Sequence, residues 1–384
     1  MKYVQEIVTK DLCEIIIKDL IEIGVDGSII LNSILTQVDD KKTTFDNAKT
    51  MIRVLYEILS NYSWDNSEKT INSIEKLLTI YHSSINLNNK NNKKHATLKK
   101  GLELCIRNTI DNLQNDNILP IIYRMCCWTI EDNINNEIIH DFARPLEYAA
   151  SIYKTSLLIK TFDDKLLPLL MKMISSNNRL ISLLGNRVIQ CLIDRNKNRQ
   201  QFEKPRTFFK NINYKITLNN YNKNDELFYK LNRQIFHDSF VNSLMYHTSK
   251  LSLEATYCSI CLLAVEIPCG FTAASLTCLI MNFQDLMIDQ HVNIKREITY
   301  HVHAMVMSLM TLICWIHKAQ VFYSYVDKIM MKRAQYAPHL NPPLLAEYDF
   351  AILYVLWDKP ELFFVDWEVR YGLWKCFRSS SSSE

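Results

Sequence analysis

Apolar residues recur at intervals of three and four along almost the whole chain, and this spacing limits the fold more than any other feature. Near the amino terminus the pattern contains Val4, Ile7, Val8, Leu12, Ile15 and Ile16, and it returns in the segments 51–59 and 71–81. Apolar side chains three and four residues apart lie on one face of an α-helix. Alternation of the kind that strands require is not credible anywhere. The sequence therefore predicts an all-α protein.

One segment indicates how the helices are organised. Leu166–Leu170 opens a helix with Pro168 in its first turn, where the missing N–H is tolerated. Ser175–Asn178 forms a short polar turn, and Leu180–Ile193 forms a returning helix in which Gly185 permits close approach. A helical hairpin cannot bury its apolar face alone and stacks on its neighbours. A succession of such hairpins predicts an armadillo- or HEAT-like helical-repeat solenoid.

Changes in composition divide the chain into four parts. We expect N-terminal helical repeats over 1–200, a basic and Asn-rich connection over 201–223, C-terminal helical repeats over 224–378, and a disordered tail over 379–384. Within the C-terminal repeats, the pattern predicts helices near Asp225–Phe236, Leu251–Val265, Phe271–Ile288, Ile294–His317 and Val321–Gln335, and a last amphipathic piece that ends at Trp357. On the first of these helices, Leu227, Leu231, Ile235 and Phe236 are expected to share the apolar face.

The uncharged stretch from Ile298 to His317 has the length of a membrane span, which needs about 20 apolar residues. It carries His301, His303 and Ser308, whose side chains are costly in hydrocarbon. A buried core helix is therefore the better interpretation.

Glycine is too scarce and too widely spaced for the common nucleotide and hydrolase motifs. The six glycines are Gly24, Gly27, Gly101, Gly185, Gly270 and Gly372. No two stand two or five residues apart, which excludes the dinucleotide fingerprint, the nucleophile elbow and the P-loop. We therefore predict a protein without catalytic residues and without a cofactor. An esterase, the remaining enzymatic alternative, would need the nucleophile elbow that the sequence lacks.

The eleven cysteines are expected to be reduced and mostly buried, as in a cytosolic protein. Those inside apolar periodic segments are Cys105, Cys126, Cys191, Cys258, Cys261, Cys278 and Cys314. Cys258 and Cys261 form a CxxC pair, but no second pair stands near enough to complete a zinc site. His301 and His303 would point in different directions on a helix. No metal site is predicted.

Basic residues cluster in the connection between the two sets of repeats. Because Lys plus Arg number 44 and Asp plus Glu 41, the net charge of +3 does not favour nucleic acid as a partner. The cluster contains Arg195, Lys197, Arg199, Lys204, Arg206 and Lys210, with Glu203 as its one acid. Each cation could contribute about 1 kcal/mol near an anionic leaflet, so the cluster predicts binding to acidic membrane lipids. A solvated inter-repeat loop is the other interpretation.

A second basic group is expected to be a solvated loop, because it adjoins an Asn-rich run that has little apolar surface to bury. This group contains Lys90, Lys93, Lys94, Lys99 and Lys100.

The order of several segments resembles the Efr-three family, also called rolling blackout. The segment Val188–Arg199 is similar to the family's Leu-x-Asp-Arg-x-x-Asn-Arg helix end. The likeness continues through 225–245 with its Phe-Tyr-Lys-Leu-Asn centre, through 253–289 with Gln284-Asp285, and through 298–337, while 29–40 resembles the family's Ile-Leu-x-x-Leu-Asp turn. No single motif is diagnostic, and the argument is the ordered series, which covers roughly residues 25 to 350.

The resemblance implies a rod of helical repeats at the cytoplasmic face of the plasma membrane. Members of the family recruit the type III alpha phosphatidylinositol 4-kinase through a tetratricopeptide adaptor. A palmitoylated, cysteine-rich N-terminus anchors them together with a basic surface. The expected function is therefore that of a non-catalytic peripheral scaffold.

The chain departs from the family pattern at both ends. Its N-terminal segment contains only Cys13 and no Met-Gly start, and the sequence finishes shortly after Trp374. These departures suggest a short paralogue or an incomplete gene model. A cytosolic helical-repeat module that binds another protein, without a lipid anchor, is the alternative function.

Overall fold

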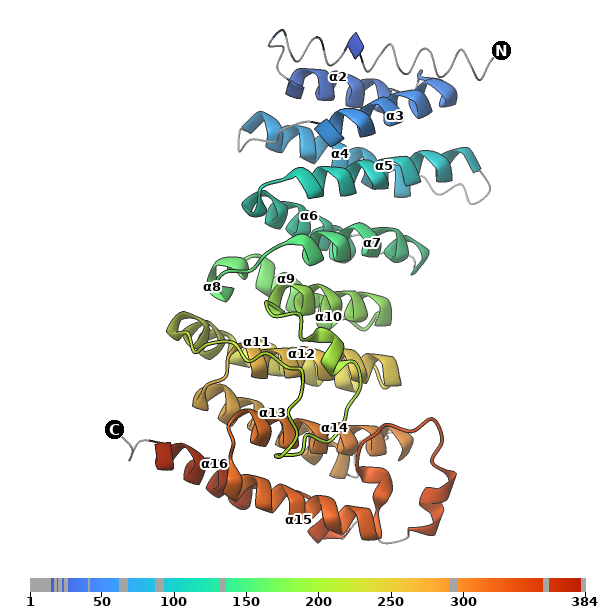
Figure 1. Ribbon diagram of the computed structural model, residues 1–384. Coiled ribbons are helices and arrows are strands. Elements are labelled where there is room, and N and C mark those ends of the chain that lie inside the picture. Colours follow the sequence, from blue (N-terminus) through green and yellow to red (C-terminus); the bar gives the residue numbers. More distant parts are fainter. Residues whose placement is uncertain are drawn as a thin grey trace. The chain divides into compact units, whose positions relative to one another are not determined.

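A computed structural model describes residues 15–16, 19, 23, 27–40, 42–61, 68–86, 93–131, 136–289, 296–354 and 359–380. In these segments the regular structure consists of α-helices and short 3-10 helices, without a strand (Figure 1). The all-α helical-repeat prediction is thus confirmed. Contacts divide the chain into a first unit, Met1–Lys154, and a second unit, Thr155–Glu384.

Where the structure describes the first unit, it consists of helices that pack against one another. They are α2 (Gly27–Asp39), α3 (Phe45–Asn61), α4 (Glu68–Asn86), α5 (Lys93–Asn112), the 3-10 turn η1 (Asn115–Asn117), α6 (Ile118–Glu131) and α7 (Asn136–Ile152). Helix α3 packs on α5, α4 on α5, and α6 on α7. Fully buried Ile85, Cys105, Ile110 and Phe142 contribute to the core between them.

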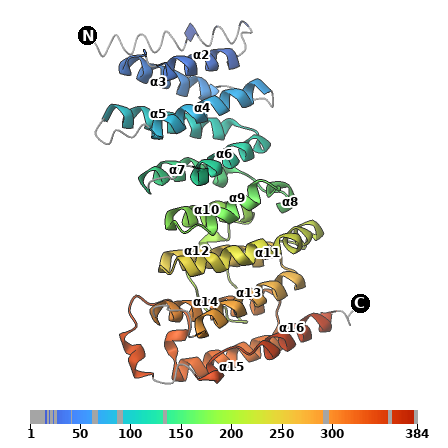
Figure 2. The same cartoon turned by 180° about the vertical axis from the view of Figure 1, so that it is seen from behind.

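The second unit repeats the same arrangement in two layers (Figure 2). It contains α8 (Leu158–Thr161), α9 (Leu166–Ile174), α10 (Arg179–Ile193), η2 (Arg199–Phe202), α11 (Lys223–Tyr246), α12 (Lys250–Glu266), α13 (Gly270–Ile288), α14 (Arg296–Ile316), α15 (Gln320–Tyr336), η3 (Pro338–Leu340), η4 (Asp349–Leu353), η5 (Pro360–Leu362) and α16 (Asp366–Ser380). Helices α9, α11 and α13 follow one another in one layer, and α10, α12 and α14 in the other.

The hairpin of α9 and α10 has the predicted form. Asn178 caps α10, since its side-chain oxygen accepts hydrogen bonds from the backbone N–H groups of Leu180 and Ile181. A Cβ atom on Gly185 would lie 2.8 Å from Cβ of Met173 and 3.0 Å from the backbone N of Ile174. Glycine at this position therefore lets the two helices approach closely.

Helices α13 and α14 are long and apolar enough to cross a membrane, but most of each lies inside the folded unit. The apolar windows of the two helices are 61% and 83% buried, respectively. On α14, Val302, Met305 and Leu312 are fully buried. The prediction of a core helix over 298–317 is confirmed.

The predicted apolar face of α11 is partly wrong. Leu227 and Leu231 are 45% and 70% exposed, whereas Phe228, Tyr229 and Phe236 are buried. The helix contacts α9 and α13, its aromatic rings pack against one another, and Tyr229 also packs against Phe271 of α13. Two adjacent apolar stripes were therefore available, and tertiary packing selected the aromatic one.

The amphipathic piece predicted to end at Trp357 is not an α-helix where the structure describes it. The segment contains η4, and Ile352 and Leu353 on it are about 80% exposed. Residues 355–358 lie outside the described residues. The last α-helix is instead α16, which extends to Ser380 and includes the first two residues of the expected tail.

Arg333 of α15 holds the segment that follows it. This side chain is completely buried, and it donates hydrogen bonds to the backbone carbonyls of Leu362 (2.7 Å), His303 (3.1 Å) and Leu340 (3.0 Å). Burial lowers the pKa of Arg333 to about 9. The guanidinium also lies over the ring of Phe364, 5.5 Å from its centre. Arg333 therefore connects α14 and α15 to the segment that leads into α16.

The second basic group is not a loop where it is described. Lys93, Lys94, Lys99 and Lys100 belong to α5, and Lys90 lies outside the described residues. Lys99 forms an ion pair with Asp141 of α7 at 2.7 Å. Part of the basic group, Lys99, therefore helps to hold α5 against α7.

Candidate functional site

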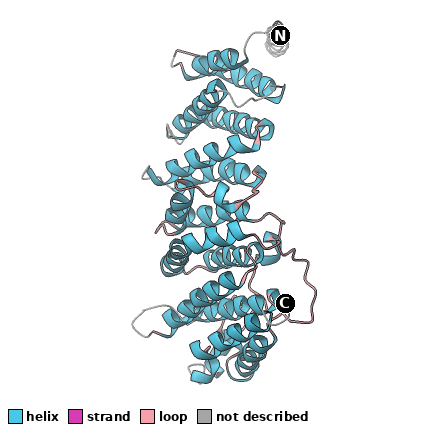
Figure 3. Ribbon diagram, turned by 90° about the vertical axis from the view of Figure 1, so that its left-hand side faces the viewer, coloured by secondary structure: helices cyan, strands magenta, loops and turns pink. Residues whose placement is uncertain are grey.

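The connection between α10 and α11, residues 195–222, is an ordered segment that crosses the surface of the second unit. We call it the strap. It leaves α10, passes α12, reaches α14 and returns to α11 (Figures 1 and 3). The predicted connection 201–223 thus lies within the second unit. Two residues of this connection, Phe202 and Phe208, are fully buried.

The strap begins at a buried ion pair. Nη1 of Arg195 lies 2.7 Å from the carboxylate of Asp225 on α11, and Nε lies 2.8 Å from that of Glu266 on α12. Both carboxylates are buried, and Asn196 donates a further hydrogen bond to Glu266 at 3.2 Å. Burial raises the pKa of Glu266, and the hydrogen bond from Arg195 opposes this shift.

A turn at Asp194 directs the strap away from α10. The Asp194 carboxylate accepts hydrogen bonds from the backbone N–H groups of Asn198 (2.7 Å) and Arg199 (2.8 Å). Lys197 in this turn has a φ of 58°. The side chain of Asn198 makes two hydrogen bonds with the backbone of Thr217, so the outgoing and returning parts of the strap are joined.

The far end of the strap is fixed to α14 by side chains of that helix. Ser308 accepts a hydrogen bond from the backbone N–H of Arg206 at 3.0 Å and donates one to its carbonyl at 2.6 Å. Thr311 accepts from the N–H of Phe208 at 3.1 Å, and the indole of Trp315 donates to the carbonyl of Ile212 at 3.1 Å. The strap is therefore anchored to α14 along about two turns of that helix.

The structure separates the six basic residues predicted to bind lipid into two groups. The arginines are held by the protein itself: besides Arg195, Arg199 donates to the sulfur of Cys191 at 3.2 Å. The guanidinium of Arg206 lies over the rings of Phe208 and Tyr214, 5.1 and 5.0 Å from their centres. The lysines Lys197, Lys204 and Lys210 are exposed. Among these six residues, the lysines therefore present the exposed charge.

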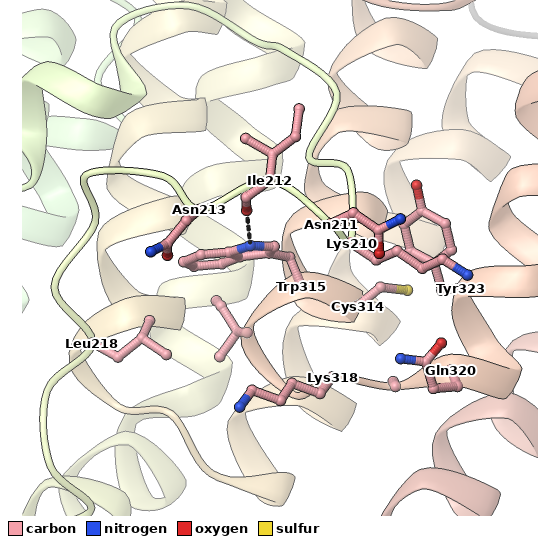
Figure 4. Close-up of a pocket in the computed structure, with 12 residues that line it drawn as sticks. Lys210, Asn211, Ile212, Asn213, Leu218, Cys314, Trp315, Lys318, Gln320 and Tyr323 are labelled. Carbon is pink, nitrogen blue, oxygen red and sulfur yellow. Dashed lines mark hydrogen bonds between the residues drawn. The ribbon is translucent and has the colours of Figure 1, made fainter.

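A cavity of about 330 Å³ lies between the tip of the strap and the turn that joins α14 to α15 (Figure 4). Trp315 and Cys314 line it on the α14 side, and Lys210 and Leu218 on the strap side. Lys318 contributes from the turn with a φ of 51°, and Figure 4 places its ammonium group across the cavity from Lys210. None of the lining residues is acidic, so the cavity has a positive rim around an aromatic wall.

This cavity could not be found from sequence. Residues 210–218 and 314–323 are about 100 positions apart, and neither segment has a binding motif. The one sequence feature that pointed toward this cavity was Trp315, near the end of an apolar helix.

A second cavity, of about 470 Å³, lies in the first unit between α3 and α5. Ile52, Leu98 and Leu104 supply apolar surface, and the rim carries three basic side chains, Lys49, Arg53 and Lys100. The lining again contains no acid.

The cysteines and histidines singled out in the sequence have packing roles. Cys258 and Cys261 are buried in α12, and burial raises the pKa of Cys258 to about 12, so this thiol stays protonated. The prediction of burial is wrong for Cys278, which is exposed, and Cys191 is half-buried. His303 is fully buried in α14. Among the described residues, no group of three potential ligands surrounds a metal position.

Stacked helical hairpins, joined here by an ordered surface strap, define a helical-repeat protein of the armadillo class. The family description "EFR3, armadillo repeat" matches residues 10–351, and the chain belongs to this family of helical-repeat scaffolds. A solved engineered protein is 12% identical with a TM-score of 0.34, over 98% of this chain and 95% of the other; a likeness this weak carries no argument. No curated protein matches the chain.

Proposed function

We propose that this protein is a non-catalytic scaffold that helps to localise a phosphatidylinositol 4-kinase at the cytoplasmic face of the plasma membrane. The observation that carries this proposal is the family match over residues 10–351, because scaffolding of that kinase is the family's known role. A type III alpha kinase, engaged through a tetratricopeptide adaptor, is the corresponding partner. The helical-repeat architecture is suited to such binding, since stacked hairpins expose long surfaces.

The strap supports a contact with acidic lipids within this proposal. Lys204 and Lys210 are exposed, and Lys318 lies on the same cavity as Lys210. Each cation near an anionic leaflet contributes about 1 kcal/mol, so a few lysines would give weak and reversible binding. We assign the contact to the lysines Lys197, Lys204 and Lys210 and give Arg195, Arg199 and Arg206 a structural role.

A liposome experiment tests the lipid contact. The variant K204E/K210E should sediment several-fold less with phosphatidylserine vesicles in low salt than the unchanged chain. The matched control is K328E/K332E on α15, which makes the same change in net charge away from the strap. Equal loss in both variants would show that only net charge matters and would remove the strap from the proposal.

A second experiment tests the kinase role. Tagged protein in cells should concentrate at the plasma membrane and recover the kinase and its adaptor in pull-downs. A diffuse cytosolic distribution with neither protein recovered would overturn the proposal. That outcome would favour the alternative, a cytosolic helical-repeat module with another protein as its partner. The commitment of three of the six predicted basic residues to internal contacts favours this alternative.

A further inference from the structure

The outer face of α16 carries a stripe of aromatic residues. Trp367, Tyr371 and Trp374 are spaced by four and three residues and are 69%, 39% and 49% exposed. The opposite face is buried: Val369 and Leu373 pack inward, and a Cβ on Gly372 would lie 2.8 Å from the ring of Phe322 on α15. Helix α16 is therefore fixed to α15 by one face (Figure 1), while the aromatic stripe on its other face is exposed.

The stripe is continuous. The rings of Trp367 and Tyr371 are 6.3 Å apart and those of Tyr371 and Trp374 are 6.0 Å apart, centre to centre. Arg378 lies 4.9 Å from the centre of the Trp374 ring, and Lys375 lies 5.6 Å from it. Contiguous exposed aromatic surface of this kind marks interaction sites on soluble proteins.

The spacing of the stripe is that of a helix-packing seam. Residues at intervals of four and three recur on the contact line of paired helices. Position 378 continues the interval after Trp374, and there the seam ends in an arginine. The stripe can therefore receive a second helix along its length.

Charge is distributed unevenly along the same helix. Asp366 and Glu368 lie at the beginning of α16, and Lys375 and Arg378 lie at its end. Glu368 and Lys375 also lie on the same side of the aromatic stripe, because seven residues are close to two helical turns. The helix thus begins with two acidic residues, of which Asp366 pairs with Arg370, and ends with basic residues beside one apolar line.

We infer that a second copy of this chain binds here, with the two α16 helices packed antiparallel. In a pair centred on Tyr371, Trp367 of one copy faces Trp374 of the other. Glu368 then lies near Lys375 of the second copy, and Asp366 lies near Arg378. The two-fold axis makes each of these contacts twice, so the surface is complementary to itself.

The charge distribution distinguishes a second copy from a membrane surface. An anionic leaflet would attract Lys375 and Arg378 but repel Asp366 and Glu368, which are exposed on the same helix. The ion pair between Asp366 and Arg370 does not prevent rearrangement, because its side chains are 62% and 68% exposed. A parallel pair would place like charges beside each other, so the antiparallel arrangement is favoured.

The contact is small, since it involves one helix from each copy. Three aromatic side chains and their charged neighbours provide several hundred Å² on each side, at the low end of specific interfaces. The dimer should therefore be weak, with a Kd on the order of 100 μM. Dimerisation through α16 does not depend on the membrane role proposed above.

Sedimentation equilibrium on the full chain, over a range of concentrations, tests the inference. The unchanged protein should show a reversible monomer–dimer equilibrium. The variant W367A should lose it, and circular dichroism should report the same helix content, because the exposed ring makes little contact with the rest of the unit. A monomer at all concentrations, or a dimer that W367A leaves intact, would overturn the inference.

A charge exchange tests the antiparallel orientation. D366K/E368K and K375E/R378E should each weaken self-association by more than five-fold, because each makes opposed half-helices alike in charge. An equimolar mixture of the two variants should recover association, since each acidic segment then faces a basic one at both ends. Two variants that dimerise alone as well as the unchanged chain, or a mixture that stays monomeric, would sink the proposed pairing.

Discussion

Nε of Arg195 lies 2.8 Å from the carboxylate of Glu266, and this contact ties the end of α10 to the end of α12. The same guanidinium reaches Asp225 on α11 at 2.7 Å. A single side chain at the start of the strap therefore holds three helices. The contribution of Arg195 to stability depends on burial, since the side chains of the two carboxylates are 1% or less exposed.

Replacement of Arg195 should be strongly destabilising. The change Arg195→Ala would leave two buried carboxylates without their cation, which costs about 3–5 kcal/mol in comparable sites. Urea unfolding followed by circular dichroism measures the loss. The control is Arg370→Ala, whose exposed ion pair with Asp366 should contribute little to stability. Similar losses in the two variants would contradict the structural role of Arg195.

Substitution of Gly185 should separate α9 from α10. The added methyl of Gly185→Ala would meet Met173 at 2.8 Å and the backbone of Ile174 at 3.0 Å, so the helices must move apart. Overpacking of this kind costs about 1–3 kcal/mol. Thermal unfolding measures it. Gly270→Ala is the matched control, because the nearest atoms to its methyl would be those of the Phe377 ring, at 3.3 Å and beyond, and stability should change little.

Removal of the hydroxyls that hold the strap should loosen it without unfolding α14. The variant Ser308→Ala/Thr311→Val leaves the backbone N–H groups of Arg206 and Phe208 without their acceptors. Each lost hydrogen bond should cost about 1 kcal/mol. Hydrogen exchange should then accelerate in residues 206–212, while Ser324→Ala on α15 serves as the control. Unchanged exchange in the strap would show that these side chains do not anchor it.

Acid should destabilise the second unit through its buried histidines. Burial lowers the pKa of His339 to about 4, and that of His303 also lies well below its usual value. The unfolded chain titrates near 6.5 and so binds more protons than the folded one as pH falls. Stability conferred by the neutral rings is complete above pH 6.5 and declines between pH 6.5 and 4.

The change His339→Phe tests this dependence. Phe keeps the aromatic contacts with Tyr300 and Tyr354, and within the described part of the chain the ring nitrogens of His339 have no hydrogen-bond partner to lose. The fall in unfolding free energy from pH 7.5 to 5.5 should shrink by about 1 kcal/mol. The control is His140→Phe, at an exposed position of α7. A variant as acid-sensitive as the original would exclude His339 as a cause.

The local parts of the fold could be predicted from sequence. Pro168 in a first turn, the polar turn at Ser175–Asn178 and Gly185 on the returning helix are all signals within about 30 residues. The long apolar run over 298–317 likewise identified the core helix α14. In these cases the chemistry of neighbouring residues determines the structure.

The strap and the fate of its basic residues could not be predicted in the same way. Arg206 and Ser308 are 102 positions apart, and no periodicity connects them. Sequence composition ranked Arg195 with Lys204 as equal cations, although the folded chain gives Arg195 two buried carboxylates and leaves Lys204 in solvent. The exposed aromatic stripe on α16 could not be predicted, because the sequence does not show which face of this helix its neighbours cover.

The strap should also change how the second unit responds to force. Stacked repeats normally come apart one after another, because each touches only its neighbours. Here the strap connects α10 to α14 across the hairpin of α11 and α12. Helix α14 therefore cannot separate from the unit until the strap detaches from it. When the second unit is pulled from its two ends, we expect it to unfold in one large extension step at high force rather than in several small steps.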